Sequence, residues 1–100
     1  MKEDLLKIIN HYGIENQKRK FSEEADELRD AIVEYQKMFR VVSPTILNNQ
    51  YKKHIAEEIA DVMVMLEQIR LHYEISLNDI KNIGKQKVKR QLKRMEKENE

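Results

Sequence analysis

The small number of helix-breaking residues is the feature that most constrains the fold of this chain. Only one proline, Pro44, and two glycines, Gly13 and Gly84, occur in 100 residues, while charged residues make up 37% of them. Because few positions can interrupt a helix, and because charged side chains suit the exposed faces of helices, this composition predicts long helices. The chain has no cysteine, which excludes disulfides and thiolate metal sites.

Four stretches of the chain repeat apolar residues at steps of three and four, the pattern of amphipathic helices. Gly13 is expected to end the first helix, and Ser76 to cap the start of the fourth. Pro44 and its β-branched neighbours predict a loop over residues 40–48. The sequence thus predicts an all-α fold, a compact four-helix bundle with antiparallel neighbours, formed as a single domain over residues 1–100. The helices are expected at about residues 2–12, 15–39, 49–73 and 77–97.

The third expected helix is apolar around most of its circumference. Ile59 and Leu66 belong to its main stripe, and Met63 and Val64 extend the apolar surface beyond that stripe. A chain of this length buries a modest fraction of its surface, so its own bundle is not expected to cover such a helix. We therefore expect the protein to form at least a dimer.

No apolar run is long enough to span a bilayer. The N-terminal residues Met1-Lys2-Glu3-Asp4 are charged, which is not typical of a signal peptide. A cytoplasmic protein without a membrane partner is the resulting expectation.

Two acidic pairs lie beside the apolar stripes of the second and third expected helices. Glu24 and Glu27 are three residues apart, as are Glu58 and Asp61, so each pair shares one helix face. Four carboxylates in one place repel each other unless a cation lies among them. Ligands that are all oxygen atoms favour Mg²⁺, or Mn²⁺, over zinc. The alternative is that both pairs are ordinary solvated helix faces.

A di-iron carboxylate bundle is a weaker metal hypothesis. Such bundles use Glu-x-x-His on two helices, and none of the three histidines of this chain follows a glutamate at that spacing. His54 lies one helical turn before Glu58 on the same face. It is a candidate substrate contact, with an ordinary boundary histidine as the alternative.

The fourth expected helix is strongly basic. Lys87, Gln91 and Arg94 share one of its faces, because they are spaced by four and three residues. Lysine and arginine cations bind phosphate oxygens, so this face is a candidate clamp for a triphosphate. A solvated basic helix, or a weak nucleic-acid surface, is the alternative that composition alone favours.

Together these motifs resemble the MazG-like all-α nucleoside triphosphate pyrophosphohydrolases. That family has Glu-Glu-x-x-Glu on one helix and Glu-x-x-Asp on the next, which match residues 23–27 and 58–61. It often continues with Lys-x-x-x-Asn-x-x-Arg, and here residues 87–94 match with Gln91 in the place of asparagine. Gln17 corresponds to the glutamine that precedes the first acidic cluster. The resemblance covers residues from about 14 to 94.

The resemblance implies the hydrolysis of a ribo- or deoxyribonucleoside triphosphate to the monophosphate and pyrophosphate, by a homodimer or homotetramer of all-α pyrophosphatase subunits. Nucleic acid is not expected as a partner of such an enzyme. Two alternatives remain: a non-enzymatic helical adaptor whose basic C-terminal helix docks an acidic partner or nucleic acid, and a related fold that only senses nucleotides. In the implied site, Mg²⁺ or Mn²⁺ is bound by Glu24, Glu27, Glu58 and Asp61, and water is activated by Glu23 or Glu27. The phosphates are bound by Lys87, Gln91 and Arg94, and His54 is a nearby candidate contact of the substrate.

Overall fold

The computed structural model describes residues 1–99, and almost all of them are helical. No strand occurs in this part of the chain, so the predicted all-α class is confirmed. The helices are α1 (Lys2–Tyr12), α2 (Ile14–Met38), α3 (Pro44–Ile46), η1 (Leu47–Lys52), α4 (Lys53–His72) and α5 (Leu77–Glu98).

The boundaries predicted at Gly13 and Ser76 are confirmed. Gly13 separates α1 from α2 with φ 85° and ψ 153°, a backbone conformation that is almost restricted to glycine. At the start of α5, the backbone N–H of Asp79 donates a hydrogen bond to the Ser76 hydroxyl oxygen at 3.4 Å. This bond satisfies one of the N–H groups that the first turn of a helix leaves without a partner.

The loop predicted over residues 40–48 is too long, because helical structure resumes at Pro44. Proline suits the first position of a helix, where its missing N–H group is not needed. The Ser43 hydroxyl oxygen accepts a hydrogen bond from the Ile46 N–H at 3.3 Å and caps this start. From Pro44 the chain stays helical through His72, and η1 is a π-helical segment within that run. The third helix therefore begins about five residues earlier than predicted.

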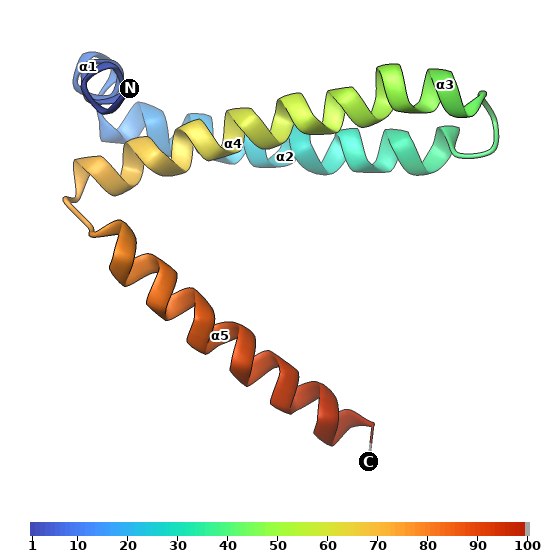
Figure 1. Ribbon diagram of the computed structural model, residues 1–100. Coiled ribbons are helices and arrows are strands. Elements are labelled where there is room, and N and C mark those ends of the chain that lie inside the picture. Colours follow the sequence, from blue (N-terminus) through green and yellow to red (C-terminus); the bar gives the residue numbers. More distant parts are fainter. Residues whose placement is uncertain (100) are drawn as a thin grey trace.

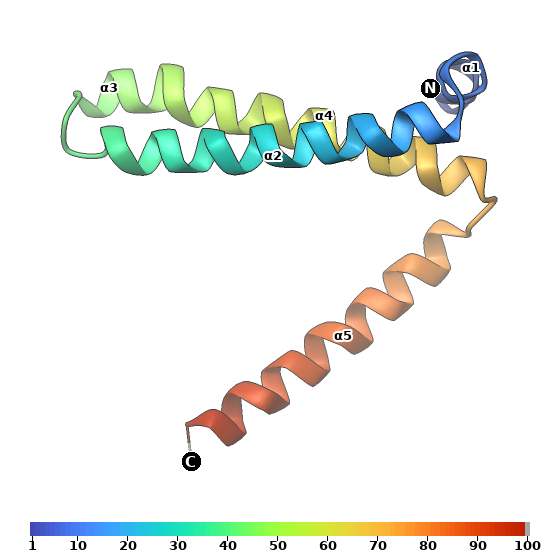
Figure 2. The ribbon, with the colours of Figure 1, turned by 180° about the vertical axis from the view of Figure 1, so that it is seen from behind.

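Helices α2 and α4 lie side by side and run in opposite directions, and α1 crosses them at one end (Figures 1 and 2). Helix α1 packs against both of the others. The buried apolar side chains come from α1, α2, η1 and α4, and comprise Leu5, Ile9, Ala31, Leu47, Met65 and Leu71.

Polar side chains occupy much of the contact between α2 and α4. Gln17, Glu24, Glu58 and Gln68 are buried, whereas Leu66, from the main apolar stripe of α4, is half exposed. Much of the apolar surface of α4 beside the buried polar residues is partly exposed, in agreement with the expectation that one chain would not cover this helix.

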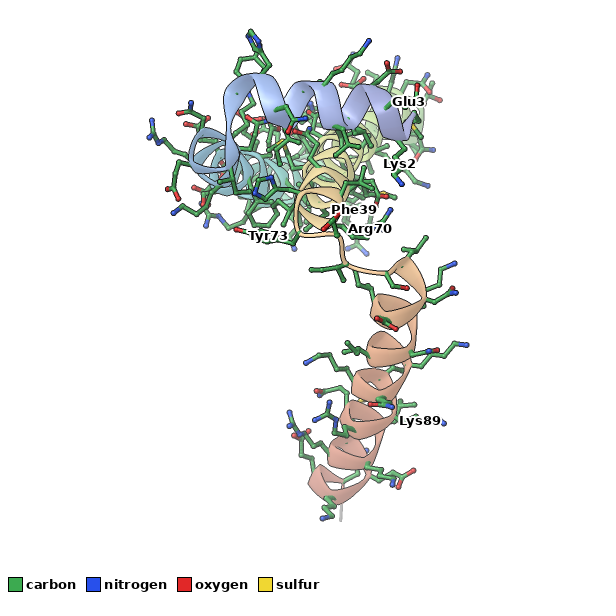
Figure 3. The ribbon with its side chains drawn as sticks, turned by 90° about the vertical axis from the view of Figure 1, so that its left-hand side faces the viewer. Lys2, Glu3, Phe39, Arg70, Tyr73 and Lys89 are labelled. Carbon is green, nitrogen blue, oxygen red and sulfur yellow. The ribbon has the colours of Figure 1, made fainter. Side chains whose placement is uncertain are left out.

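Helix α5 extends away from the other helices (Figures 1 and 2). Within the described residues it forms no extensive packing with α1, α2 or α4. In Figure 3 its side chains point outward on all sides of the helix, away from the other helices. The Cα radius of gyration is 17.5 Å, whereas about 13 Å is usual for a compact domain of 100 residues. The four long helices were predicted, but α5 does not join the other three in a compact bundle within one chain.

The turn between α4 and α5 is held by specific bonds. The Ile75 N–H donates to the Arg70 carbonyl and the Glu74 N–H to the Leu71 carbonyl, with Glu74 at φ 53°. This is the Schellman arrangement that ends many helices. The Arg70 guanidinium also pairs with the Glu67 carboxylate and donates to the Ile75 carbonyl oxygen at 2.8 Å. The direction in which α5 leaves α4 is therefore set by a defined turn (Figure 3).

Candidate functional site

Three of the four predicted metal ligands come together between α2 and α4. Glu24, Glu27 and Glu58 each offer a carboxylate oxygen, and these oxygens lie within 4.8 Å of one another. The antiparallel contact brings the Glu-x-x-Glu face of α2 against α4 at the level of Glu58. We call these three residues the carboxylate cluster.

Asp61, the fourth predicted ligand, is an exposed neighbour of the cluster. It lines the same cavity as Glu24, and its charge acts on the Glu24 carboxyl group. Glu23, one of the two predicted catalytic carboxylates, is exposed and lines this cavity as well. The other, Glu27, is exposed and belongs to the cluster itself.

Each buried glutamate of the cluster uses only one of its oxygens. Lys20 Nζ lies 3.4 Å from Glu24 Oε1, and His54 Nε2 lies 3.8 Å from Glu58 Oε1. Glu24 and Glu58 are each only 8% exposed. Their Oε2 atoms are the buried side-chain oxygens that have no hydrogen-bond partner among residues 1–99. An unpartnered buried carboxylate oxygen is costly, so these two atoms call for a cation or a donor from outside the chain.

Burial raises the pKa of the Glu24 carboxyl group above its ordinary value. The nearby charges of Glu27 and Asp61 raise this pKa further, while Lys20 opposes them. The single chain thus disfavours the ionised form of Glu24. A divalent cation among these carboxylates would reverse that preference, because an opposite charge favours ionisation.

A cavity of about 520 Å³ lies next to the cluster, among α1, α2 and α4. Pockets of this size are typical of small-molecule sites. Its walls combine apolar side chains, amides, two cations and three carboxylates. The lining residues are Ile8, Tyr12, Asn16, Gln17, Arg19, Lys20, Glu23, Glu24, Asp61, Val64, Met65 and Gln68.

The three residues of the predicted phosphate clamp share one exposed face of α5. Lys87, Gln91 and Arg94, together with Arg90, line a shallow hollow of about 240 Å³. Because α5 leads away from α2 and α4 (Figure 1), one chain does not bring this face to its own carboxylate cluster.

His54 is half exposed and approaches Glu58, as the helical spacing predicted. It lines a separate cavity of about 400 Å³ together with Asp30, Glu34 and Tyr51. Its ring therefore lies between the carboxylate cluster and this second hollow.

Sequence reasoning missed Gln68. The Gln17 side-chain N–H donates to Gln68 Oε1 at 2.7 Å, and both residues line the larger cavity. The available signal was spacing: Gln17 lies seven residues before Glu24 and Gln68 seven after Asp61, so an antiparallel contact that joins the acids also joins the amides.

Across residues 1–99, no helix is long and apolar enough to cross a membrane. Comparisons of the chain with protein-family models, with curated proteins and with solved structures gave no match.

Proposed function

We propose that this protein is a Mg²⁺-dependent hydrolase that cleaves nucleoside triphosphates to the monophosphate and pyrophosphate. The observation that carries the proposal is the pair of buried, unpartnered oxygens, Glu24 Oε2 and Glu58 Oε2, in two residues whose carboxylates approach that of Glu27. An all-oxygen set beside a cavity suits a hard divalent cation and an anionic ligand. The motif resemblance of both acidic pairs supports the same reaction.

Different residues of the site carry out metal binding, proton transfer and stabilisation of the leaving group. Glu24, Glu27, Glu58 and Asp61 would hold Mg²⁺, which, when bound, neutralises phosphate charge and lowers the pKa of a water molecule. Glu23 or Glu27, both exposed at this place, accepts a proton from the attacking water. A bond forms between the water oxygen and the α-phosphorus, the bond from the α-phosphorus to the bridging oxygen breaks, and pyrophosphate leaves. Lysine and arginine cations stabilise that leaving group.

The first prediction concerns this reaction. Mixed ribo- and deoxyribonucleoside triphosphates with Mg²⁺ are expected to release pyrophosphate, measured by a coupled assay, and chelator is expected to stop the release. Mn²⁺ is expected to restore it. Orthophosphate as the sole product, or turnover that chelator leaves unchanged, would contradict the proposal.

We also propose that the active form is a homodimer or homotetramer. Helix α4 exposes Ile59, Met63 and Leu66, and α5 exposes an apolar stripe that includes Leu92. Exposed apolar surface of this extent is unusual for a monomer. The basic α5 of one copy, placed over the acidic region of another, would bring Lys87, Gln91 and Arg94 to the carboxylate cluster that they do not reach in their own chain.

The second prediction tests this assembly. Light scattering at micromolar concentration is expected to give at least twice the mass of the 12.1 kDa chain. Leu92→Asp is expected to shift the protein toward the monomer, because Leu92 is 53% exposed in the single chain and would be covered in the oligomer. Lys93→Ala, which also lowers the net charge by one, is the matched control on a charged face of α5. A wild-type monomer of 12.1 kDa would exclude the assembly.

A non-enzymatic adaptor is the second candidate, and the free position of α5 favours it. A basic amphipathic helix that forms no extensive packing with the other helices of residues 1–99 can dock an acidic partner or nucleic acid. This function leaves the buried, unpartnered oxygens of Glu24 and Glu58 without a role. Nucleotide binding without pyrophosphate release would instead indicate a nucleotide sensor.

A further inference from the structure

We propose that the buried amide pair, Gln17 and Gln68, recognises the nucleobase of the substrate. The inference rests on the proposed nucleotide hydrolysis and adds the part of the cavity that selects among substrates.

The amide pair has hydrogen-bonding capacity that the described part of the chain does not use. Gln17 is 6% exposed and Gln68 is 2% exposed. Gln17 Nε2 donates to Gln68 Oε1, and Gln68 Nε2 makes a long contact of 3.9 Å with the Met65 sulfur. Among residues 1–99, the side-chain oxygen of Gln17, Oε1, accepts no hydrogen bond from another side chain. A primary amide can make four hydrogen bonds, so Gln17 retains an acceptor oxygen and one N–H donor, and it lines the cavity.

This combination matches the edge of a nucleobase. Glutamine and asparagine amides bind bases by pairing their adjacent donor and acceptor with an acceptor and a donor of the base. Because a buried amide that loses its partner pays a desolvation penalty, such a site discriminates between bases more strongly than apolar contact does.

The amide pair also lies at a suitable distance from the carboxylates. Along α2, Gln17 is seven residues from Glu24, and along the antiparallel α4, Gln68 is seven residues from Asp61. Seven residues of α-helix rise about 10.5 Å. A nucleotide whose α-phosphate lies at the carboxylates can therefore extend its sugar and base along the seam between α2 and α4 to the amides.

The remaining walls suit a flat ring. Tyr12 and Ile8 of α1, and Val64 and Met65 of α4, line the same cavity. Aromatic and apolar side chains stack on or pack against a base whatever its identity, so they contribute affinity without selecting one base. Selection is left to Gln17, which contacts the base, and Gln68 acts as the positioning residue that holds the Gln17 amide.

The test uses nucleosides with the full chain in chelator, so that neither metal nor turnover is needed. In ¹H–¹⁵N spectra, the side-chain NH₂ signals of Gln17 and Gln68 are expected to shift with one or two of adenosine, guanosine, cytidine, uridine and thymidine. Ribose is expected to leave these two signals unchanged. The side-chain signal of the exposed Gln36 is the internal control, and nucleosides are expected to leave it unchanged. Signals that respond to none of the nucleosides, or to all of them equally, would overturn the proposal.

Variants separate this inference from the proposed reaction. Gln17→Met keeps the approximate size of the side chain and is expected to reduce the ratio of kcat/KM between the preferred and other nucleotides about tenfold. Gln68→Met is expected to do the same, and Gln68→Glu, which keeps an acceptor for the Gln17 N–H, is expected to restore much of the ratio. Gln36→Met is the control. Turnover with an unchanged ratio in Gln17→Met would refute base recognition alone, whereas nucleoside binding without any turnover would refute the hydrolase alone.

Discussion

Replacing Glu24 with glutamine is expected to abolish Mg²⁺-dependent turnover and to raise the melting temperature of the metal-free protein. Glutamine keeps the shape of the side chain but supplies no negative charge for a divalent cation. Asp61→Asn is expected to abolish turnover for the same reason. Turnover is measured as pyrophosphate release, and melting is followed by circular dichroism in chelator.

The gain in stability follows from the raised pKa of Glu24. The folded chain binds the Glu24 proton more tightly than the unfolded chain does, so the free energy of unfolding falls as the pH rises from the ordinary pKa, near 4.5, through the folded value. The stabilisation by Glu24→Gln should therefore be greatest at neutral pH and vanish at pH values below the ordinary pKa. Added Mg²⁺ should reverse the order, because it stabilises the wild type and not the variant.

Glu57→Gln is the matched control, since Glu57 is an exposed carboxylate on α4 outside the cluster. It should change neither turnover nor melting appreciably. A marked drop in the metal-free melting temperature of Glu24→Gln would mean that the Glu24 carboxylate stabilises the fold, most directly through Lys20, and the metal proposal would lose its main support.

Arg94→Ala is expected to lower kcat/KM for the triphosphate by about 10- to 150-fold, while Lys93→Ala is expected to change it little. A hydrogen bond to a charged group contributes about 1.5–3 kcal/mol, which corresponds to that range. Arg94 lies in the hollow with Lys87 and Gln91, and Lys93 lies outside it. Both substitutions remove one positive charge, so the contrast isolates the position of the charge. Steady-state kinetics at two salt concentrations provide the measurement.

Equal losses in the two variants would indicate general attraction between a basic helix and a polyanion. A steep dependence of both losses on salt would then favour the adaptor with a nucleic-acid partner.

Local rules predicted the helices of this fold well, because their ends depend on single residues. Gly13 ends α1 through its backbone conformation, and Ser76 begins α5 through its capping hydroxyl group, as the sequence predicts. Pro44 misled the prediction because proline both ends helices and starts them, and the Ser43 cap decides between the two. The position of α5 could not be predicted, since it depends on the Glu74 turn and on the contacts of Arg70.

The carboxylate cluster was predictable because its spacing is itself a helical signal. Both pairs have the same three-residue spacing. On antiparallel neighbouring helices, a contact between one acid of each pair therefore brings the other two acids close together as well. Gln68 was missed because a single glutamine on a helix is ordinary. Its spacing from Asp61 matches that of Gln17 from Glu24, but only the register of α2 against α4 shows that the two amides pair. The exposure of Ile59 and Leu66 was expected from the apolar circumference of their helix, but periodicity does not say what covers such a face.

The π-helical segment η1 has a consequence for how insertions and deletions would act on this protein. Its i to i+5 bonding holds one residue more per turn than an α-helix does. Removing one residue from this stretch would let η1 close as an ordinary α-turn, so Leu47 and Glu58 would keep about the same direction relative to each other. Both would stay in contact with α2, the buried Leu47 near the α2–α3 turn and the carboxylate that completes the cluster. A second deletion would find no extra residue to remove, and it would rotate the two side chains apart by about 100°, the turn of one α-helical residue.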